Sequence, residues 1–321
     1  MKGSADAASV QCAAGVLMVR PCSFRHNQQT SATNRFQRST QRQQSDASGA
    51  SAEFDLLARR IADAGVNVCV VEDTPLPVKP DAIFPNNWVS FHSDGTVALY
   101  PMMAPNRRLE RRADVIASVE RQLGFRRRRV LDLSGHEQHG RYLEGTGSLV
   151  LDHVCRVAYA SRSSRTDESL VHSWCEQLGY EPVVFDALGI DGVPVYHTNV
   201  LLSIGSRWAL VCSEVIAAAD RTRVLQRLGG GRELIEIDRR AMEQFAANVL
   251  ELRCFAADAQ GKQLLIMSDR ARSALQRLPG DAWTRLQGAV DQVAAVPIPT
   301  IENIGGGGVR CMLAEVPDSK I

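Results

Sequence analysis

One order of predicted elements recurs along this chain and limits its fold more than any other feature: a two-stranded hairpin, then a helix, then a third strand. The alternating run Trp88–Tyr100, with its turn at Ser93-Asp94-Gly95, is the first hairpin. A helix over Arg107–Leu123 and a strand over Val130–Leu133 complete this unit. Three further hairpins, spaced about 50 residues apart, begin at Ser148, Asn199 and Asn248.

The two ends of the chain complete one more unit. Cys311–Val316 is predicted to be its first strand, and Gly15–Arg20, a helix over Glu53–Ala64 and a strand over Val66–Val71 follow. Radial repetition of small sheets protects their edges. The sequence therefore predicts an α/β fold of the five-fold pseudosymmetric propeller type, closed through its own termini. We expect a disordered N-terminus over residues 1–14 and a single domain over 15–321.

The segment 27–52 lies between the predicted strand Gly15–Arg20 and the predicted helix Glu53–Ala64. It is rich in Gln, Ser, Thr, Asn and Arg and has no apolar period. Such a composition is typical of a long loop. We therefore expect a loop or flexible lid here, placed where it can cover a site.

An unusual polar or glycine-rich segment precedes each predicted hairpin. In a closed ring, equivalent segments meet around one axis, so these five are expected to line a common centre. They are Phe84-Pro85-Asn86-Asn87, Leu143-Glu144-Gly145-Thr146-Gly147, Tyr196-His197-Thr198-Asn199, Phe245-Ala246-Ala247-Asn248 and Gly305-Gly306-Gly307-Gly308, which leads into Cys311.

Three side chains from these segments form a candidate catalytic set: Cys311, His197 and Glu144. A thiolate needs a nearby imidazole or cation, and the imidazole needs a carboxylate that fixes its tautomer. Taken singly, each residue also has a structural interpretation: a core cysteine, a hydrogen-bonded buried histidine and a turn-capping glutamate. Their equivalent positions in separate units favour the catalytic interpretation.

The overall charge and the cysteine spacing exclude several function classes. With 37 basic and 36 acidic residues the formal net charge is +1, so no global field attracts nucleic acid or an anionic membrane. The eight cysteines lack zinc-site or thioredoxin spacing, and no apolar run approaches the roughly 20 residues of a membrane span. We expect a cytoplasmic protein without a metal or cofactor, with a homodimer as one candidate assembly.

Two short motifs resemble other sites but lack their context. His136-Glu137-Gln138-His139 has its histidines three residues apart, whereas a zincin helix needs them four apart on one face. Gly145-Thr146-Gly147 lacks the third glycine and the strand-to-helix context of a dinucleotide fingerprint. A loop is expected at the first, and no nucleotide site at the second.

Taken together, these segments resemble the pentein superfamily of guanidine-modifying enzymes, from about Val16 to Glu315. The most specific stretches are Phe84–His92, Leu143–Asp152, Tyr196–Val200 and Gly306–Glu315. They look most like the branch of citrulline-utilisation hydrolases, or arginine deiminase-related amidinotransferase-domain proteins. The resemblance implies a five-unit ring, with Cys311 as nucleophile, His197 as general acid–base and Glu144 as its orienting carboxylate.

The resemblance also implies a substrate-binding set, which comprises Asp81, Phe84, Asn86, Asn87 and Asn199. In deiminases several of these positions carry carboxylates, and here they carry amides. An amide both donates and accepts hydrogen bonds, which suits a neutral ureido group better than a charged guanidinium. The alternative is that the asparagines only hold turns. Gly308 and Ala247 stand where this branch is expected to have serine and glycine, which leaves the substrate fit open.

The sequence therefore predicts a cysteine-dependent hydrolase of C–N bonds in the ureido or guanidino group of citrulline- or arginine-type amino acids. The reaction is expected to pass through a covalent thio-intermediate at Cys311, and the partner is a small amino-acid substrate. Four alternatives stay open: an arginine deiminase, a dimethylargininase, an amidinotransferase, and a non-catalytic amino-acid-binding protein.

Overall fold

The computed structural model describes residues 10–38, 43–255 and 261–318. Within them, the strands form five three-stranded sheets. In each sheet the first strand of the unit pairs antiparallel with the second, and the second pairs parallel with the third. Four sheets are built from consecutive strands, in the order β3 (Val89–Phe91), β4 (Thr96–Leu99), β5 (Arg129–Asp132); β6 (Val150–Asp152), β7 (Val157–Ser161), β8 (Glu181–Phe185); β9 (Leu202–Ile204), β10 (Trp208–Val211), β11 (Glu233–Glu236); β12 (Leu250–Arg253), β13 (Gln263–Ser268), β14 (Gln292–Val296).

The fifth sheet joins the two ends of the chain. β15 (Ala314–Val316) pairs antiparallel with β1 (Gly15–Arg20), which pairs in parallel with β2 (Asn67–Glu72). This pairing of the termini is as the sequence predicts. A mixed α/β fold of small sheets is thereby confirmed. The described strands form no closed sheet, so the five-fold propeller stays a prediction.

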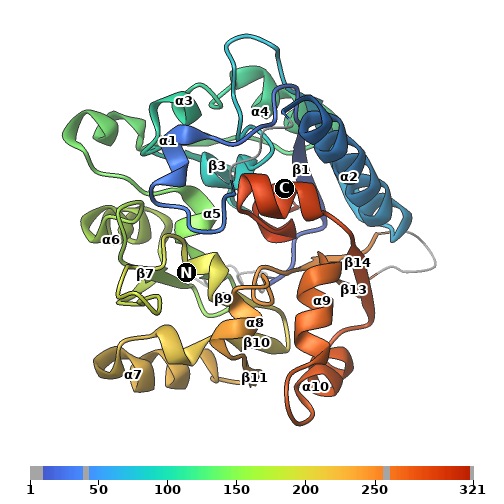
Figure 1. Cartoon of the computed structure of the whole chain (residues 1–321). Coiled ribbons are helices and arrows are strands. Elements are labelled where there is room, and N and C mark those ends of the chain that lie inside the picture. Colours follow the sequence, from blue (N-terminus) through green and yellow to red (C-terminus); the bar gives the residue numbers. More distant parts are fainter. Residues whose placement is uncertain (1–9, 39–42, 256–260, 319–321) are drawn as a thin grey trace, which may run out of the picture.

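A helix connects the second and third strand of every sheet, and Figure 1 shows these helices at the periphery of the molecule. The longer helices are α2 (Gln43–Asp63), α4 (Ala113–Leu123), α6 (Glu168–Leu178), α7 (Ala218–Leu228), α9 (Asp269–Gln276) and α10 (Ala282–Gly288). The shorter α- and 3-10 helices are α1 (Gln28–Ser31), η1 (Pro85–Asn87), α3 (Pro105–Arg108), η2 (Ser134–His139), α5 (Gly145–Ser148), η3 (Thr198–Val200), η4 (Ser213–Val215), α8 (Arg239–Met242) and η6 (Val309–Met312), and η5 (Ile301–Gly305) is a π-helix.

Helix α6 shows how local sequence sets these elements. The Asp167 carboxylate accepts the backbone N–H of Leu170 and caps the N-terminus, and Gly179 ends the helix in the left-handed region at φ 68°. The apolar face, which includes Trp174, is buried in one core cluster with the strand residue Ala158. Burial of this face therefore fixes the helix against its own sheet.

Two sequence expectations need correction. The segment 27–52 is not a continuous loop, because α1 lies within it and α2 begins at Gln43 rather than Glu53. Buried Ala50 extends the apolar stripe of Phe54 and Leu57 by one turn, and its small side chain hides this period. The helix expected over Arg107–Leu123 is likewise split into α3 and α4. The expected disorder of residues 1–14 falls mostly outside the described residues, while Gly15 already starts β1.

Within the described residues, no helix is long and apolar enough to cross a membrane.

Candidate active site

Four of the five segments before the first strands are short helical turns that bring their polar residues together. η1 precedes β3, α5 precedes β6, η3 precedes β9 and η6 precedes β15. α5 contacts both η1 and η3, and η1 contacts η6. The sequence expectation that these segments meet is therefore confirmed for these four turns, although Cys311 lies in η6 and not in the strand that follows it.

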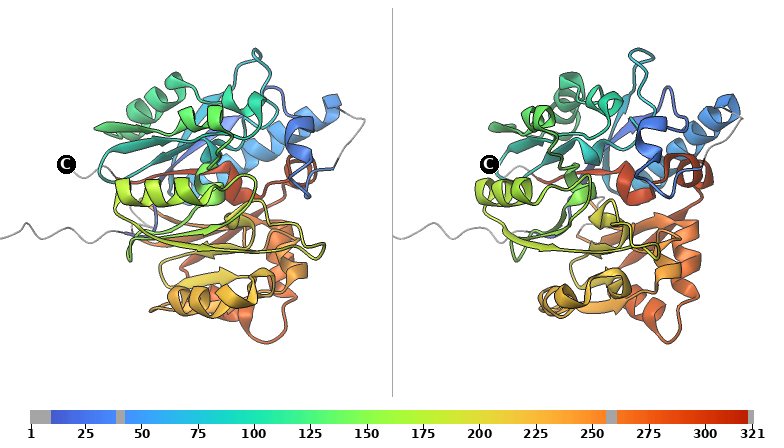
Figure 2. Two further views of the ribbon diagram at one scale, coloured as in Figure 1. Left: turned by 90° about the vertical axis from the view of Figure 1, so that its left-hand side faces the viewer. Right: turned by 60° about the vertical axis from the view of Figure 1, so that its left-hand side comes forward.

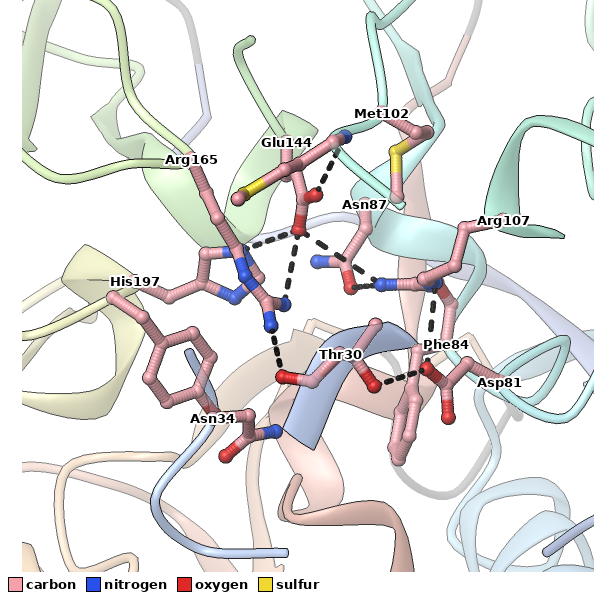
Figure 3. A network of polar contacts seen from close by, with 12 residues as sticks. Thr30, Asn34, Asp81, Phe84, Asn87, Met102, Arg107, Glu144, Arg165 and His197 are labelled. Atoms are coloured by element: carbon pink, nitrogen blue, oxygen red, sulfur yellow. Dashed lines mark hydrogen bonds and ion pairs between the residues drawn. The ribbon is translucent and has the colours of Figure 1, made fainter. Parts of the chain in front are cut away.

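The buried carboxylate of Glu144 is the centre of the polar network in Figure 3. Its Oε2 lies 2.9 Å from Nε2 of His197, 3.3 Å from Nη1 of Arg165 and 3.9 Å from Nη1 of Arg107. Its Oε1 accepts the backbone N–H of Met103 at 3.1 Å. Burial alone would raise the pKa of Glu144, but Arg165, His197 and Arg107 outweigh it and lower that pKa below its usual range. Glu144 is therefore ionised at neutral pH.

His197 is buried and neutral at neutral pH. Its desolvation lowers its pKa to about 4, and the opposing attraction of Glu144 does not restore the usual value. Because Glu144 is ionised, Nε2 carries the ring proton and donates a hydrogen bond to Oε2. Nδ1 is then left without a proton and can act as an acceptor. The imidazole can therefore take up a proton at Nδ1, and Glu144 stabilises the cation that results.

Cys311 is buried, and its thiol is bordered by two side-chain amides. Sγ lies 3.3 Å from Nδ2 of Asn248 and 3.7 Å from Nδ2 of Asn199. Burial raises the pKa of the Cys311 thiol above its ordinary value, although the Asn248 amide and the nearby Arg310 charge oppose this effect. Without a ligand the thiol is therefore protonated.

Cys311 and His197 line one common pocket, whose volume is only about 20 Å³. Its lining also includes Asp81, Phe84 and Asn87. A space of this size holds about one water molecule, so an amino acid needs the pocket to open.

The pocket also contains residues that sequence reasoning did not single out; these are Thr30, Asn34, Arg107, Arg165 and Tyr196. Arg107 and Arg165 each lie between the hairpin and the following long helix of successive units. This shared position in two units is a sequence signal that could have identified both arginines. Asn248 was identified only as part of its segment, and its contact with Cys311 appears only in the fold.

Two polar atoms in the wall of the pocket have no protein partner among the described residues. They are Oδ1 of Asp81 and Nδ2 of Asn87. The other atoms of these groups are occupied, since Asn87 Oδ1 accepts Arg107 Nη1 at 2.8 Å and Asp81 Oδ2 accepts Asn27 Nδ2 at 2.8 Å. Buried groups of this kind call for an explanation, and a ligand with one donor and one acceptor would satisfy both.

Asn86 and Asn199 are not among the residues that line this pocket, and their contact with a substrate stays a prediction. The Asn86 amide is directed to Thr146 Oγ1 at 3.3 Å. Asn199 donates to the carbonyl of Thr146 at 3.1 Å and lies beside the Cys311 sulfur. Both residues therefore support the walls in the absence of a ligand.

The glycines of the Gly145-Thr146-Gly147 segment let these walls approach one another. A Cβ at Gly145, where φ is +47°, would lie 2.2 Å from the Asn86 carbonyl oxygen. A Cβ at Gly147 would lie 2.5 Å from Asn87 Nδ2 and 2.7 Å from His197 Nδ1. Asn87 and His197 can therefore lie this close to the backbone of residue 147 only because that residue is glycine.

Residues 27–38, called here the lid segment, contribute Thr30 and Asn34 to the lining of the pocket. Figure 2 shows this blue segment beside the red helical turn η5. Thr30 Oγ1 donates to Asp81 Oδ2 at 3.2 Å, and Arg165 Nη2 donates to the Thr30 carbonyl at 3.0 Å. Asn34 Nδ2 donates to the carbonyl of Gly306 at 3.2 Å. The lid segment thus occupies charged groups that a substrate would need.

Within the described residues, no cluster of three or more histidine, cysteine, aspartate or glutamate side chains has an arrangement that could hold a metal ion. The segment His136–His139 belongs to the 3-10 helix η2 (Ser134–His139) instead of the expected loop, and its Glu137 is paired with Arg111.

Comparison with known families identifies the chain. The family model for N,N-dimethylarginine dimethylhydrolase, eukaryotic, matches residues 20–317. The chain belongs to this family. The resemblance to pentein-superfamily enzymes is thereby confirmed, within the dimethylhydrolase family. No curated protein matches the chain significantly.

Solved structures share the fold of this dimethylhydrolase-family chain. One is the N-terminal domain of ArgZ, an arginine dihydrolase from cyanobacteria, as a cysteine-to-serine variant with substrate bound. Its TM-score is 0.72 at 16% identity, and the alignment covers 96% of this chain and 99% of the ArgZ domain. A dimethylarginine dimethylaminohydrolase adduct with S-methyl-L-thiocitrulline has a TM-score of 0.63 at 15% identity, over 94% of this chain and 98% of its own.

AgrE in complex with ornithine and NAD+ has a TM-score of 0.71 at 18% identity and covers 96% of this chain. The family member described here spans only 40% of that AgrE chain and 41% of full-length ArgZ. At such identities these likenesses concern the fold.

Proposed function

We propose that the protein hydrolyses C–N bonds in the guanidino or ureido group of arginine-type amino acids. Cys311 is the nucleophile, His197 the general acid–base and Glu144 the carboxylate that orients it. The observation that carries this proposal is that Cys311 and His197 line one pocket, and that His197 is hydrogen-bonded to the buried Glu144. Membership of the dimethylhydrolase family supports it, as does the covalent reaction intermediate in a structure of ArgZ.

The reaction divides into two steps. His197 Nδ1 takes the proton of the Cys311 thiol, the sulfur attacks the central carbon, and the imidazolium returns the proton to the departing nitrogen. The amine leaves and an S-linked intermediate remains. His197 then deprotonates a water that attacks the same carbon, and the C–S bond breaks to release the product and restore the thiol.

One carboxylate at the pocket offers a contact for a cationic substrate. Asp81 and Glu144 lie near the guanidinium groups of Arg107 and Arg165, but the free Oδ1 of Asp81 still offers an acceptor for a guanidinium N–H. A bound guanidinium would also lower the pKa of the Cys311 thiol, because a nearby cation stabilises the thiolate. Substrate binding is thereby linked to activation of the nucleophile.

A second round of hydrolysis, on the ureido product, is favoured by Asn87. Its unpartnered Nδ2 is a donor that matches a ureido carbonyl oxygen, and a carboxylate at this position could not donate. Attack on the ureido carbon would release ammonia, and hydrolysis of the thiocarbamate would give a carbamate that loses CO2. The complete reaction would convert an arginine-type amino acid and two waters into an ornithine-type amine, two ammonia and CO2.

The architecture we propose around this site is a ring of five blades, each a three-stranded sheet with its outer helix. The blade-like sheets and the peripheral helices support it. We also propose that residues 15–321 act as one domain, because the fifth sheet joins both ends of the chain.

The experiment that tests this function uses arginine, citrulline, asymmetric dimethylarginine and N-succinylarginine as separate substrates. The expected result is release of ammonia or dimethylamine together with citrulline- or ornithine-type products. Cys311→Ala should abolish turnover, and Cys155→Ala, at an exposed cysteine, should retain it. Turnover that survives in Cys311→Ala would overturn the assignment. Binding of these compounds without turnover would favour the non-catalytic binding protein.

A further inference from the structure

A basic cavity lies between the lid segment and the body of the protein, beside the active-site pocket. Its volume is about 210 Å³. Arg35 and Arg38 line it from the lid segment, and Arg239 of α8 and Arg270 of α9 line it from the body. The acidic residue in its wall is the exposed Glu243.

Two of the four arginines in this cavity have a carboxylate partner among the described residues, and two do not. Arg35 pairs with Asp191 at 2.5 Å, and Arg270 Nη1 is 3.9 Å from Glu302. Over residues 10–38, 43–255 and 261–318, by contrast, neither Arg38 nor Arg239 has a carboxylate within ion-pair distance of its guanidinium. Repulsion between the two uncompensated guanidinium groups, Arg38 on the lid segment and Arg239 on the body, opposes closure of the lid segment over the body.

The floor of the cavity is aromatic and touches the active site. Phe36 of the lid segment lies 5.0 Å from Phe245 and 6.1 Å from Tyr196, between ring centroids. Tyr196 lines both the basic cavity and the active-site pocket. Its hydroxyl donates to the carbonyl of Gly306, which Asn34 of the lid segment also contacts.

We propose that this basic cavity binds a small anion with at least two negatively charged oxygens, and that the bound anion holds the lid segment closed. A carboxylate or phosphate accepts the paired N–H donors of guanidinium groups. Because two of the arginines belong to the lid segment and two to the body, one anion can bridge both. Any ligand that binds only the closed state stabilises it. The anion has two candidate sources: a free ion, or an anionic group at the α-end of a substrate.

The free-ion source is tested with inorganic phosphate and with succinate at constant ionic strength. The readouts are isothermal titration calorimetry and the alkylation rate of Cys311 by iodoacetamide, followed on its own peptide. We expect saturable binding and Cys311 alkylation that is several-fold slower. Arg239→Gln should weaken binding about tenfold, as expected for one charge-assisted hydrogen bond, and Arg38→Gln should do the same. The matched control Arg240→Gln changes the neighbouring exposed arginine, which does not line the cavity, and should bind like the wild type.

The substrate-borne source is tested in Cys311→Ala protein, where N-succinylarginine and N-acetylarginine differ by one carboxylate. We expect about tenfold tighter binding of the succinyl compound, and loss of this preference in Arg239→Gln but not in Arg240→Gln. Specific binding by either source supports the proposal. If neither source binds in an Arg239-dependent manner, or if Arg240→Gln has the same effect, the proposal is overturned. None of these readouts needs turnover, so a failure of the anion-binding proposal is distinct from a failure of the proposed hydrolysis.

Discussion

Glu144 and His197 are joined by a hydrogen bond of 2.9 Å between Oε2 and Nε2, and both side chains are almost completely buried. The bond fixes which ring nitrogen carries the proton, so that Nδ1 is the basic atom. It also places a carboxylate next to the cation that forms when His197 accepts the thiol proton.

Glu144→Gln keeps the shape of this contact but removes its charge. We expect kcat to fall about a hundredfold or more, because the imidazolium loses its counter-ion and the preferred tautomer is no longer fixed. The control is Glu168→Gln, at a surface carboxylate paired with Arg162, which should change kcat little. An unchanged kcat in Glu144→Gln would remove Glu144 from the catalytic set.

The raised pKa of Cys311 gives a pH prediction in the absence of substrate. A thiol reacts through its thiolate, whose fraction rises as the pH approaches the pKa. Because burial raises the pKa of Cys311 above its ordinary value, its alkylation rate should climb from pH 7 to 9 without a plateau. A cysteine peptide, with an ordinary pKa of about 8.5, should level off earlier. A plateau for Cys311 below pH 8 would instead indicate a thiolate already paired with a cation.

Asn87→Asp separates the two proposed rounds of hydrolysis. The aspartate can still accept the hydrogen bond of Arg107, which Asn87 Oδ1 accepts at 2.8 Å, but it cannot donate to a ureido oxygen. We expect the rate on citrulline to fall at least tenfold relative to the rate on arginine, so that citrulline accumulates. Asn86→Asp, outside the pocket lining, is the control. Equal losses on both substrates would mean that Asn87 does not select the ureido group.

Gly145→Ala should destabilise the protein more than Gly140→Ala. Both glycines have positive φ, +47° and +66°, but an added Cβ meets the Asn86 carbonyl at Gly145 and nothing within 4 Å at Gly140. The conformational cost of about 1 kcal/mol is therefore shared, and overpacking adds roughly 1–3 kcal/mol at Gly145. Urea unfolding measures both free energies. Equal losses would show that the α5 turn can shift away from η1.

The recurring element order could be predicted from the sequence because every unit buries its own strands and helix, which leaves an apolar pattern in each. The helix Glu168–Leu178, for example, is bounded by local signals, since Asp167 and Gly179 cap its two ends. The start of α2 was not readable, because its first turns are polar and its stripe continues only through Ala50. Patterns identify elements where apolar side chains are large.

The candidate site was predictable to the level of residues but not of contacts. Cys311, Glu144 and His197 were identified from their equivalent positions. Arg165 was missed because its importance comes from its contacts with Glu144 and with Thr30 in the distant lid segment. Which amide faces the pocket is also set by packing between units, so Asn87 and Asn199 could not be distinguished in advance.

The measurement that tests the central claim most directly is mass spectrometry of acid-quenched turnover, with the Cys311 peptide mapped. The proposed chemistry predicts a transient adduct of the substrate's amidino or carbamoyl carbon on Cys311, absent in Cys311→Ala along with turnover. Turnover by the wild type without any adduct on Cys311, or turnover by Cys311→Ala, would contradict it.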